Sequence, residues 1–166
     1  VLALAIVGNF ALGVYMHELP FSPARLQYYS WHKWVGVLVL AVSFFRLLTR
    51  LMAPPPALPQ AIEAAMPGWQ KLAHHATHIG LYALFFAVPL TGWAFSSAAG
   101  FPIVLFGVLP LPDFVPVSEA LADVLKEAHE IAALSMAALV LLHVAGAVKH
   151  QLIDRDGLMA RMGFGR

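Results

Sequence analysis

Residues 126–150, KEAHEIAALSMAALVLLHVAGAVKH, carry His129 and His143 at either end of an almost wholly apolar stretch. The interval is close to four turns of an α-helix, so both imidazoles are expected on nearly the same face, about 21 Å apart along the axis. The stretch is long enough to span a bilayer, which places one histidine near each membrane surface. Ionisable side chains inside a membrane are costly and mark functional sites. The pattern therefore suggests a pair of buried cofactors stacked across the membrane.

The composition is that of a membrane protein. Of the 166 residues, 60% are hydrophobic and only 11% are charged, whereas soluble domains average about 25% charged residues. The chain has no cysteine, which excludes disulfides, iron–sulfur clusters and covalent c-type haem attachment within it. Its metal ligands are eight histidines and six methionines, a set that favours haem over zinc. No basic cluster indicates nucleic acid as a partner.

The apolar runs predict an all-α integral membrane protein, a four-helix up-down-up-down bundle forming one transmembrane domain over residues 1–166. The predicted helices cover residues 1–16, 31–52, 72–95 and 118–153. The first run starts without an initiator Met and is apolar from its first residue, so we expect that helix to begin upstream. The Pro-rich stretch 96–116 is predicted to be a loop lying in or on the membrane interface.

The distribution of Lys and Arg predicts the orientation. One predicted side holds Arg46, Arg50, Lys71, Lys149, Arg155, Arg161 and Arg166, and the other holds Arg25, Lys33 and Lys126. Short cytoplasmic loops carry the excess of basic residues. Both termini are therefore predicted to be cytoplasmic.

A histidine on another predicted helix lies at the same expected depth in the membrane as His129. His32 opens the predicted helix 31–52 at the same outer surface where His129 opens the helix 118–153. A b-type haem held between helices needs one imidazole from each, at matched depth. Gly36, one turn below His32, would let a porphyrin approach the helix. Lys33 is either a propionate partner or an interfacial lysine.

His143 needs a partner near the inner surface. Within the sequence the candidate is His78, and the alternative is a histidine upstream of Val1; the residues leave both open. His150, at the inner end of the same helical stripe, could bind a cofactor as well. The HHxxH run at residues 74–78 lacks the Glu of HExxH, and a zinc hydrolase is not expected.

Three stretches resemble the prokaryotic cytochrome b561 family of four-helix di-haem membrane proteins. They are WHKWVGVLVLAVSFFRLLTRL, LAHHATHIGLYALFFAVPLTGW and AHEIAALSMAALVLLHVAGAVKHQLIDRDGLMARM. The chain is similar too to the cytochrome b subunits of formate dehydrogenases and nickel–iron hydrogenases. The resemblance implies a bacterial inner-membrane protein with two haem b groups. It assigns the outer haem to His32 and His129, and the inner haem to His143 and a first-helix histidine, which we expect upstream of Val1.

Bis-histidine haem has no open coordination position, which favours one-electron transfer over oxygen chemistry. The resemblance implies a quinone partner, ubiquinone or menaquinone, at a haem edge near His150, His75 or His78. Some family members oxidise superoxide at the outer face and reduce ubiquinone. The alternative function is a non-catalytic haem-binding anchor of a larger oxidoreductase, docked to a redox protein or to a second copy.

The charge on the predicted outer side argues against an anion substrate. Three basic residues face six acidic ones there: Glu18, Asp113, Glu119, Asp123, Glu127 and Glu130. Positive potential is what would draw an anion such as superoxide to a site. This charge balance predicts weak electrostatic attraction of an anion to the outer side, unless Arg25 and Lys33 alone line the haem edge.

Overall fold

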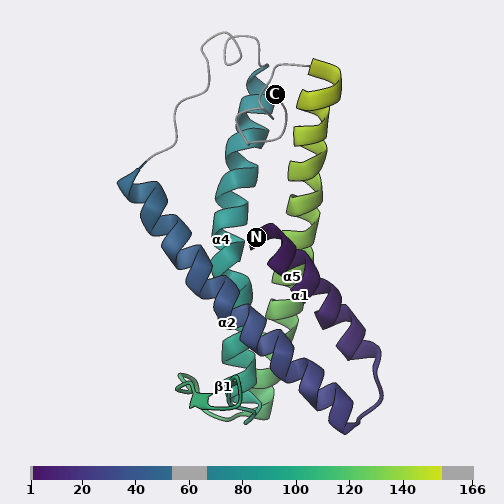
Figure 1. The fold of residues 1–166 in the computed structure, drawn as a ribbon, viewed down its shortest axis with the longest axis vertical. Helices are drawn as coiled ribbons and strands as arrows, with labels where there is room; N and C mark the ends of the chain where they lie inside the picture. Colours follow the sequence, from purple (N-terminus) through teal and green to yellow (C-terminus); the bar gives the residue numbers. More distant parts are fainter. Residues whose placement is uncertain (1, 54–66, 155–166) are drawn as a thin grey trace. The chain divides into compact units, whose positions relative to one another are not determined.

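The computed structural model describes residues 2–53 and 67–154, apart from the side chains of His150 and Asp154. Helices dominate these residues (Figure 1). They are α1 (Leu2–Glu18), α2 (Pro23–Met52), α4 (Gly68–Ala98) and α5 (Glu119–Lys149), the last continued by the π-helix η1 (His150–Asp154). A short hairpin of β1 (Val104–Leu105) and β2 (Leu109–Pro110) lies between α4 and α5 in the sequence.

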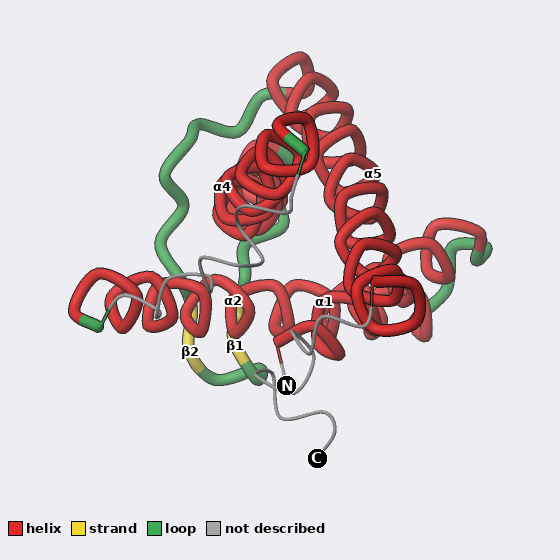
Figure 2. Tube along the Cα trace, turned by 90° about the horizontal axis from the view of Figure 1, so that it is seen from above, coloured by secondary structure: helices red, strands yellow, loops and turns green. Residues whose placement is uncertain are grey.

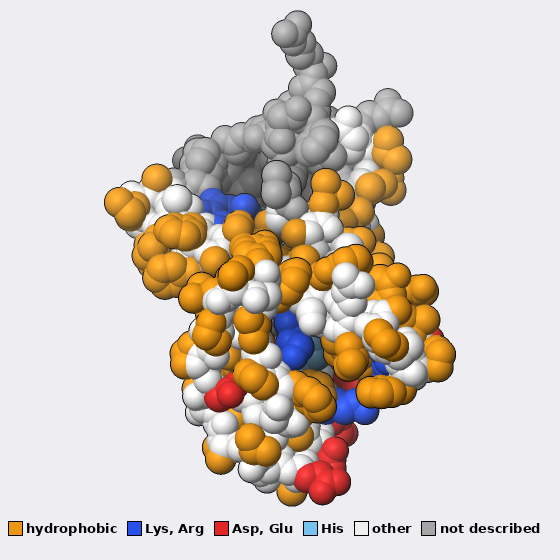
Figure 3. All heavy atoms as spheres, turned by 60° about the horizontal axis from the view of Figure 1, so that its bottom comes forward, with side chains coloured by type: hydrophobic (Ala, Val, Ile, Leu, Met, Phe, Trp, Pro, Cys, Tyr) orange, Lys and Arg blue, Asp and Glu red, His pale blue; other side chains and the backbone are white. Residues whose placement is uncertain are grey.

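Three helical segments among the described residues are long and apolar enough to cross a membrane: Pro23–Met52, Gly68–Ala98 and Glu119–Ile153. The 17-residue α1 is apolar but shorter. Large apolar side chains on the spans are exposed, such as Ile79 at 70% and Leu141 at 71%. Figure 3 shows apolar side chains over most of the visible face. This confirms an all-α helical membrane protein; the up-down-up-down order stays a prediction.

The described residues form two compact units. The first unit holds α1, α2, α4 from Ala83, the hairpin and α5 up to Leu134. In it α1 packs on α2. Ile6 and Met16 of α1 and Val39 of α2 are buried.

The second unit holds α4 up to Tyr82 and α5 from Ser135. Leu81 and Met136 are buried there. A Cβ added to Gly80 would lie 2.7 Å from Leu139 Cδ1, so the glycine is what allows α4 and α5 to approach so closely in this unit.

The helices depart from their predicted bounds, and most at α2, which begins at Pro23 rather than at residue 31. Ser22 is its N-cap, with the side-chain Oγ accepting the Arg25 N–H at 3.2 Å. Pro23 occupies the first helical turn, where a missing N–H has no cost. The predicted helices leave residues 17–30 outside any helix, whereas here Ser22 and Pro23 start α2.

Smaller differences occur elsewhere. Helix α1 reaches Glu18, and α4 covers Gly68–Ala98 instead of 72–95, with Pro89 inside it. The α-helical part of α5 ends at Lys149, and the chain continues to Asp154 as η1. Helix ends fray into other hydrogen-bond patterns, so such bounds are the least predictable part of a helix.

The predicted irregular loop contains an antiparallel hairpin, with Val104 paired to Pro110 and Leu105 to Leu109. Phe106 and Gly107 have φ of 53° and 75°, and the Val108 N–H donates to Leu105 O at 3.1 Å. A turn with positive φ at both central residues matches the twist of hairpin strands. Figure 2 shows both strands beside α2.

Candidate functional site

The first unit brings His32 of α2 and His129 of α5 together. Their ring centroids lie 6.1 Å apart, with the ring planes at 86°. His32 Nδ1 contacts the backbone oxygen of Asn9 at 3.1 Å, and His129 Nδ1 contacts that of Val88 at 2.9 Å. A carbonyl oxygen only accepts, so each Nδ1 carries the hydrogen and donates it. In a neutral imidazole this leaves Nε2 with a free lone pair.

A glycine stands four residues after each of these carbonyls. A Cβ on Gly13, after Asn9, would lie 3.1 Å from His32 Cε1. A Cβ on Gly92, after Val88, would lie 2.9 Å from His129 Cε1. A helical side chain covers the turn that precedes it, so a glycine at this spacing uncovers the carbonyl. The two histidines thus use the same local arrangement, on α1 for His32 and on α4 for His129.

These partners were not predicted. The sequence predicts the small residue at Gly36, on the same helix as His32. A Cβ there would meet only Asn9 Nδ2, at 3.9 Å, which is ordinary contact. Gly13 and Gly92 lie on the helices that face the two histidines. They can be identified only once the rotation of those helices about their own axes is known. Thr91 adds its Oγ1 at 3.4 Å from His129 Nδ1.

The His32–His129 pair fits a bis-histidine haem iron. Imidazole–metal bonds are about 2 Å long, so two imidazoles on opposite sides of one metal have ring centres roughly 6 Å apart. The observed separation is 6.1 Å. Metal-bound histidines almost always donate their other ring N–H to a carbonyl or carboxylate, as both Nδ1 atoms do here.

The second unit brings His143 of α5 to His78 of α4, the partner predicted within the chain. Their ring centroids are 5.1 Å apart and the planes are at 90°. His78 Nδ1 contacts the backbone oxygen of His74 at 2.7 Å. The separation is shorter than the roughly 6 Å expected across a metal. The backbone of His150 lies in η1, and its side chain lies outside the described part of the structure.

Lys33, predicted as either a propionate partner or an interfacial lysine, contacts the last turn of α4 and the loop that follows it. Its Nζ donates to Ser96 Oγ at 3.0 Å and to the Phe101 backbone oxygen at 2.9 Å. Ser96 Oγ also donates to the Phe101 oxygen. An ammonium has three N–H donors, and these contacts use two of them. The side chain next to His32 therefore holds the loop between α4 and α5.

Comparison with known proteins gives one family over nearly the whole chain. The family model described as prokaryotic cytochrome b561 matches residues 1–165. Cytochrome b561 homolog 2 of Escherichia coli (strain K12) is 34% identical over 170 residues, covering 96% of this chain and 84% of the relative. Cytochrome b561 homolog 1 of the same organism is 31% identical over 131 residues, with coverages of 79% and 72%.

A third relative carries a functional name. The probable superoxide oxidase CybB of Yersinia pestis is 30% identical over 147 residues, covering 86% of this chain and 79% of the relative. The match to the family model spans nearly the whole chain. The chain therefore belongs to the prokaryotic cytochrome b561 family, as a multi-pass bacterial membrane protein of electron transfer with the b-type haem binding that this family implies.

Proposed function

We propose that this protein transfers electrons across the bacterial inner membrane through two bis-histidine b-type haems. It would exchange electrons between the quinone pool and a redox partner. The observation that carries the proposal is the His32–His129 pair, with ring centroids 6.1 Å apart and both Nδ1 atoms on backbone carbonyls. Residues 1–166 would form a single transmembrane cytochrome b domain with both termini in the cytoplasm.

The chain's own residues hold the two imidazoles in place for the outer haem. The carbonyls of Asn9 and Val88 fix the tautomer and orientation of the rings, which also raises the basicity of each Nε2. Gly13 and Gly92 leave room for the rings against α1 and α4. When bound, haem with two histidine ligands supplies reversible one-electron transfer and has no open position for oxygen.

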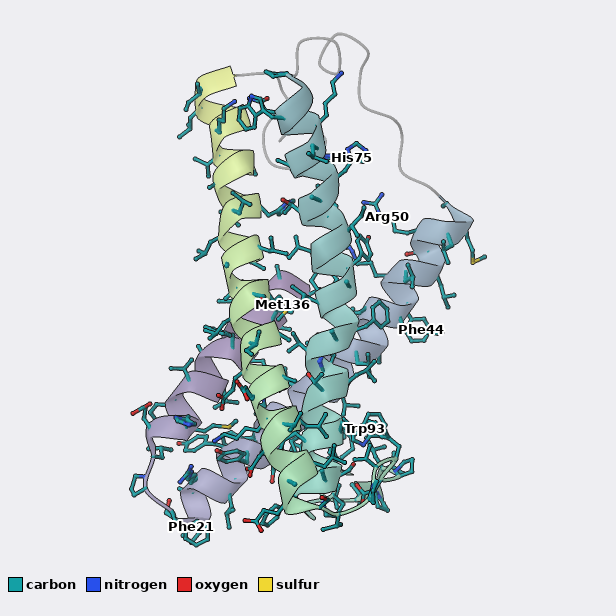
Figure 4. All side chains as sticks on the ribbon, turned by 180° about the vertical axis from the view of Figure 1, so that it is seen from behind. Phe21, Phe44, Arg50, His75, Trp93 and Met136 are labelled. Atoms are coloured by element: carbon teal, nitrogen blue, oxygen red, sulfur yellow. The ribbon has the colours of Figure 1, made fainter. Side chains whose placement is uncertain are left out.

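The second haem would use His143. Two partners compete for it: His78, supported by its place beside His143 in the second unit although the 5.1 Å ring separation is short for a shared metal, and a first-helix histidine upstream of Val1, supported by the family resemblance. His150 and His75 would be proton-exchanging groups for ubiquinone or menaquinone at the edge of this haem, since an imidazole can both donate and accept a proton. His75 is labelled in Figure 4 on α4, with its Nδ1 2.8 Å from the Lys71 backbone oxygen.

The name of the Yersinia pestis relative supports one specific version of the reaction. In it two superoxide anions each give up one electron at the outer face and are released as dioxygen, and ubiquinone takes up these two electrons together with two protons to become ubiquinol. Lys33 lies beside His32 and would supply positive potential for the anion. Its two contacts to Ser96 and Phe101 hold the ammonium in a defined position.

Haem counting tests the proposal. The purified chain would be examined by reduced-minus-oxidised spectroscopy and by pyridine-haemochrome quantitation. We expect two haems per chain, one lost in either His32→Ala or His129→Ala and the other lost in His143→Ala. His17→Ala is the matched control, because this histidine is 58% exposed and pairs with Glu18. A full haem content in His129→Ala would refute the ligand assignment.

The partner of His143 and the functional class need two further measurements. Loss of the second haem in His78→Ala, at equal protein yield, would assign His78 as its ligand; retention would favour the upstream histidine. The alternative function is a haem-binding anchor subunit of a larger oxidoreductase. Quinone reduction by the isolated protein supports the enzyme, whereas a stable stoichiometric partner on purification, or a second copy needed for haem reduction, supports the anchor or a homodimer.

A further inference from the structure

We propose that residues 101–117, here called the hairpin loop, bind the lipid surface of the same membrane that the helices cross. The hairpin loop contains β1 and β2 and connects two spans, α4 and α5. Because it joins the ends of two spans, the hairpin loop must lie at one membrane surface. The proposal is independent of how many haems the protein binds.

The exposed side of the hairpin loop is apolar. Its exposed large side chains are Phe101, Val104, Phe106, Val108, Leu109, Phe114 and Val117, with Val108 80% exposed. Asp113 is the single charged residue in the sequence of this loop. Contiguous exposed apolar patches mark interaction surfaces. Protein interfaces carry a polar rim and are enriched in Arg, and one aspartate over seventeen residues does not provide that rim.

Hydrogen bonds from α2 fix the level of the hairpin loop. Trp34 Nε1 donates to the Val104 backbone oxygen at 2.7 Å, and Lys33 Nζ donates to that of Phe101 at 2.9 Å. These donors lie roughly three turns, about 16 Å, beyond the first residue of α2. At this point the sequence of α2 changes from polar residues to the apolar run VGVLVLAV. Trp and Lys are residues that anchor helices at the membrane–water boundary.

The hairpin loop is also held against α2 and α4. Ile103 is 3% exposed. Phe106 and Phe114 remain more than half exposed, although the Phe106 ring lies 5.6 Å from that of Trp34 on α2 and the Phe114 ring lies 5.4 Å from that of Trp93 on α4. Figure 4 labels Trp93 beside this loop. The loop is thus attached to two helices while most of its large apolar side chains stay exposed, at the level where α2 enters the bilayer. Lipid at the headgroup–acyl boundary matches these side chains in both polarity and position.

Site-directed spin labelling tests the depth of the hairpin loop. The chain contains no cysteine, so a label on Val108→Cys reports on this position alone. Leu141→Cys, on a 71% exposed residue of a span, gives the lipid reference. Glu18→Cys, at the end of α1 with a 79% exposed side chain, gives the aqueous reference. The protein would be reconstituted in vesicles of phosphatidylethanolamine and phosphatidylglycerol.

The readout is the ratio of collision rates with oxygen, which partitions into lipid, and with a water-soluble nickel chelate. We expect the ratio at Val108→Cys to approach that at Leu141→Cys and to exceed that at Glu18→Cys several-fold. A ratio equal to that at Glu18→Cys in vesicles would overturn the proposal. The proposal would also be overturned if the label at Val108→Cys were accessible to the nickel chelate in vesicles but shielded from it in native membranes, since that result indicates a protein partner.

Discussion

His129 lies against Gly92 of α4, so closely that an added Cβ would stand 2.9 Å from its Cε1, while its Nδ1 donates to the carbonyl four residues earlier. His32 makes the same pair of contacts with Gly13 and Asn9 on α1. Each histidine of the site is therefore positioned by a helix other than its own. Substitutions on these facing helices should act on haem binding without touching a ligand.

Gly92→Ala should displace His129 and lower the haem content by one haem per chain, because a Cβ at 2.9 Å cannot be accommodated without a shift of the imidazole. Pyridine-haemochrome quantitation measures the loss. Gly8→Ala is the matched control, since a Cβ there has no neighbour within 4 Å. Equal haem contents in the two variants would contradict the positioning role of Gly92.

Gly80→Ala should destabilise the second unit. Its Cβ would lie 2.7 Å from Leu139 Cδ1, and overpacking costs typically about 1–3 kcal/mol. The free energy of unfolding in detergent measures the effect. The double variant Gly80→Ala/Leu139→Ala should recover the part of the lost stability that comes from overlap of the two side chains. A double variant no more stable than Gly80→Ala would argue against overlap as the cause. Gly146→Ala meets no neighbour within 4 Å and should be neutral or stabilising.

Ser22→Ala should lower the free energy of unfolding by about 1 kcal/mol, the usual cost of losing an N-cap. The lost interaction is the 3.2 Å hydrogen bond from the Arg25 N–H to Ser22 Oγ. Ser22→Asp keeps an acceptor at the cap and should retain most of the stability. If the alanine and aspartate variants were equally destabilised, α2 would not depend on this cap.

Lys33→Met should loosen the hairpin loop, because it removes both hydrogen bonds to Ser96 and Phe101. Hydrogen bonds from charged groups contribute about 1.5–3 kcal/mol each. Amide hydrogen exchange across residues 99–108 should accelerate at least several-fold. Lys126→Met, which loses only an exposed pair with Glu130 at 4.0 Å, should leave this exchange unchanged. Similar exchange in both variants would mean that Lys33 does not hold the loop.

The sequence was sufficient to predict helical spans and the proximity of His32 and His129, because both depend on quantities that it carries directly. Apolar runs give the spans, and the position of a histidine within its run gives its depth. The proximity of His78 and His143 followed from the same matching. Their roles as ligands stay predictions.

Other features depend on information that a single sequence does not carry. Gly13 and Gly92 matter because of how α1 and α4 are rotated about their axes, and hydrophobic periodicity is weak on helices that are apolar on every side. The hairpin has strands of two residues each, too short for an alternating pattern to emerge. The start of α2 was misjudged because proline both breaks helices and favours their first turn.

The carbonyl contacts of the two histidines have an evolutionary consequence. A backbone oxygen is present whatever side chain its residue bears, so positions 9 and 88 can drift among many residue types while still orienting His32 and His129. The glycines at positions 13 and 92 have no such latitude. Among diverging relatives with this arrangement, positions 9 and 88, which make the contacts, should therefore vary. Positions 13 and 92, which only leave room for the imidazoles, should be invariant.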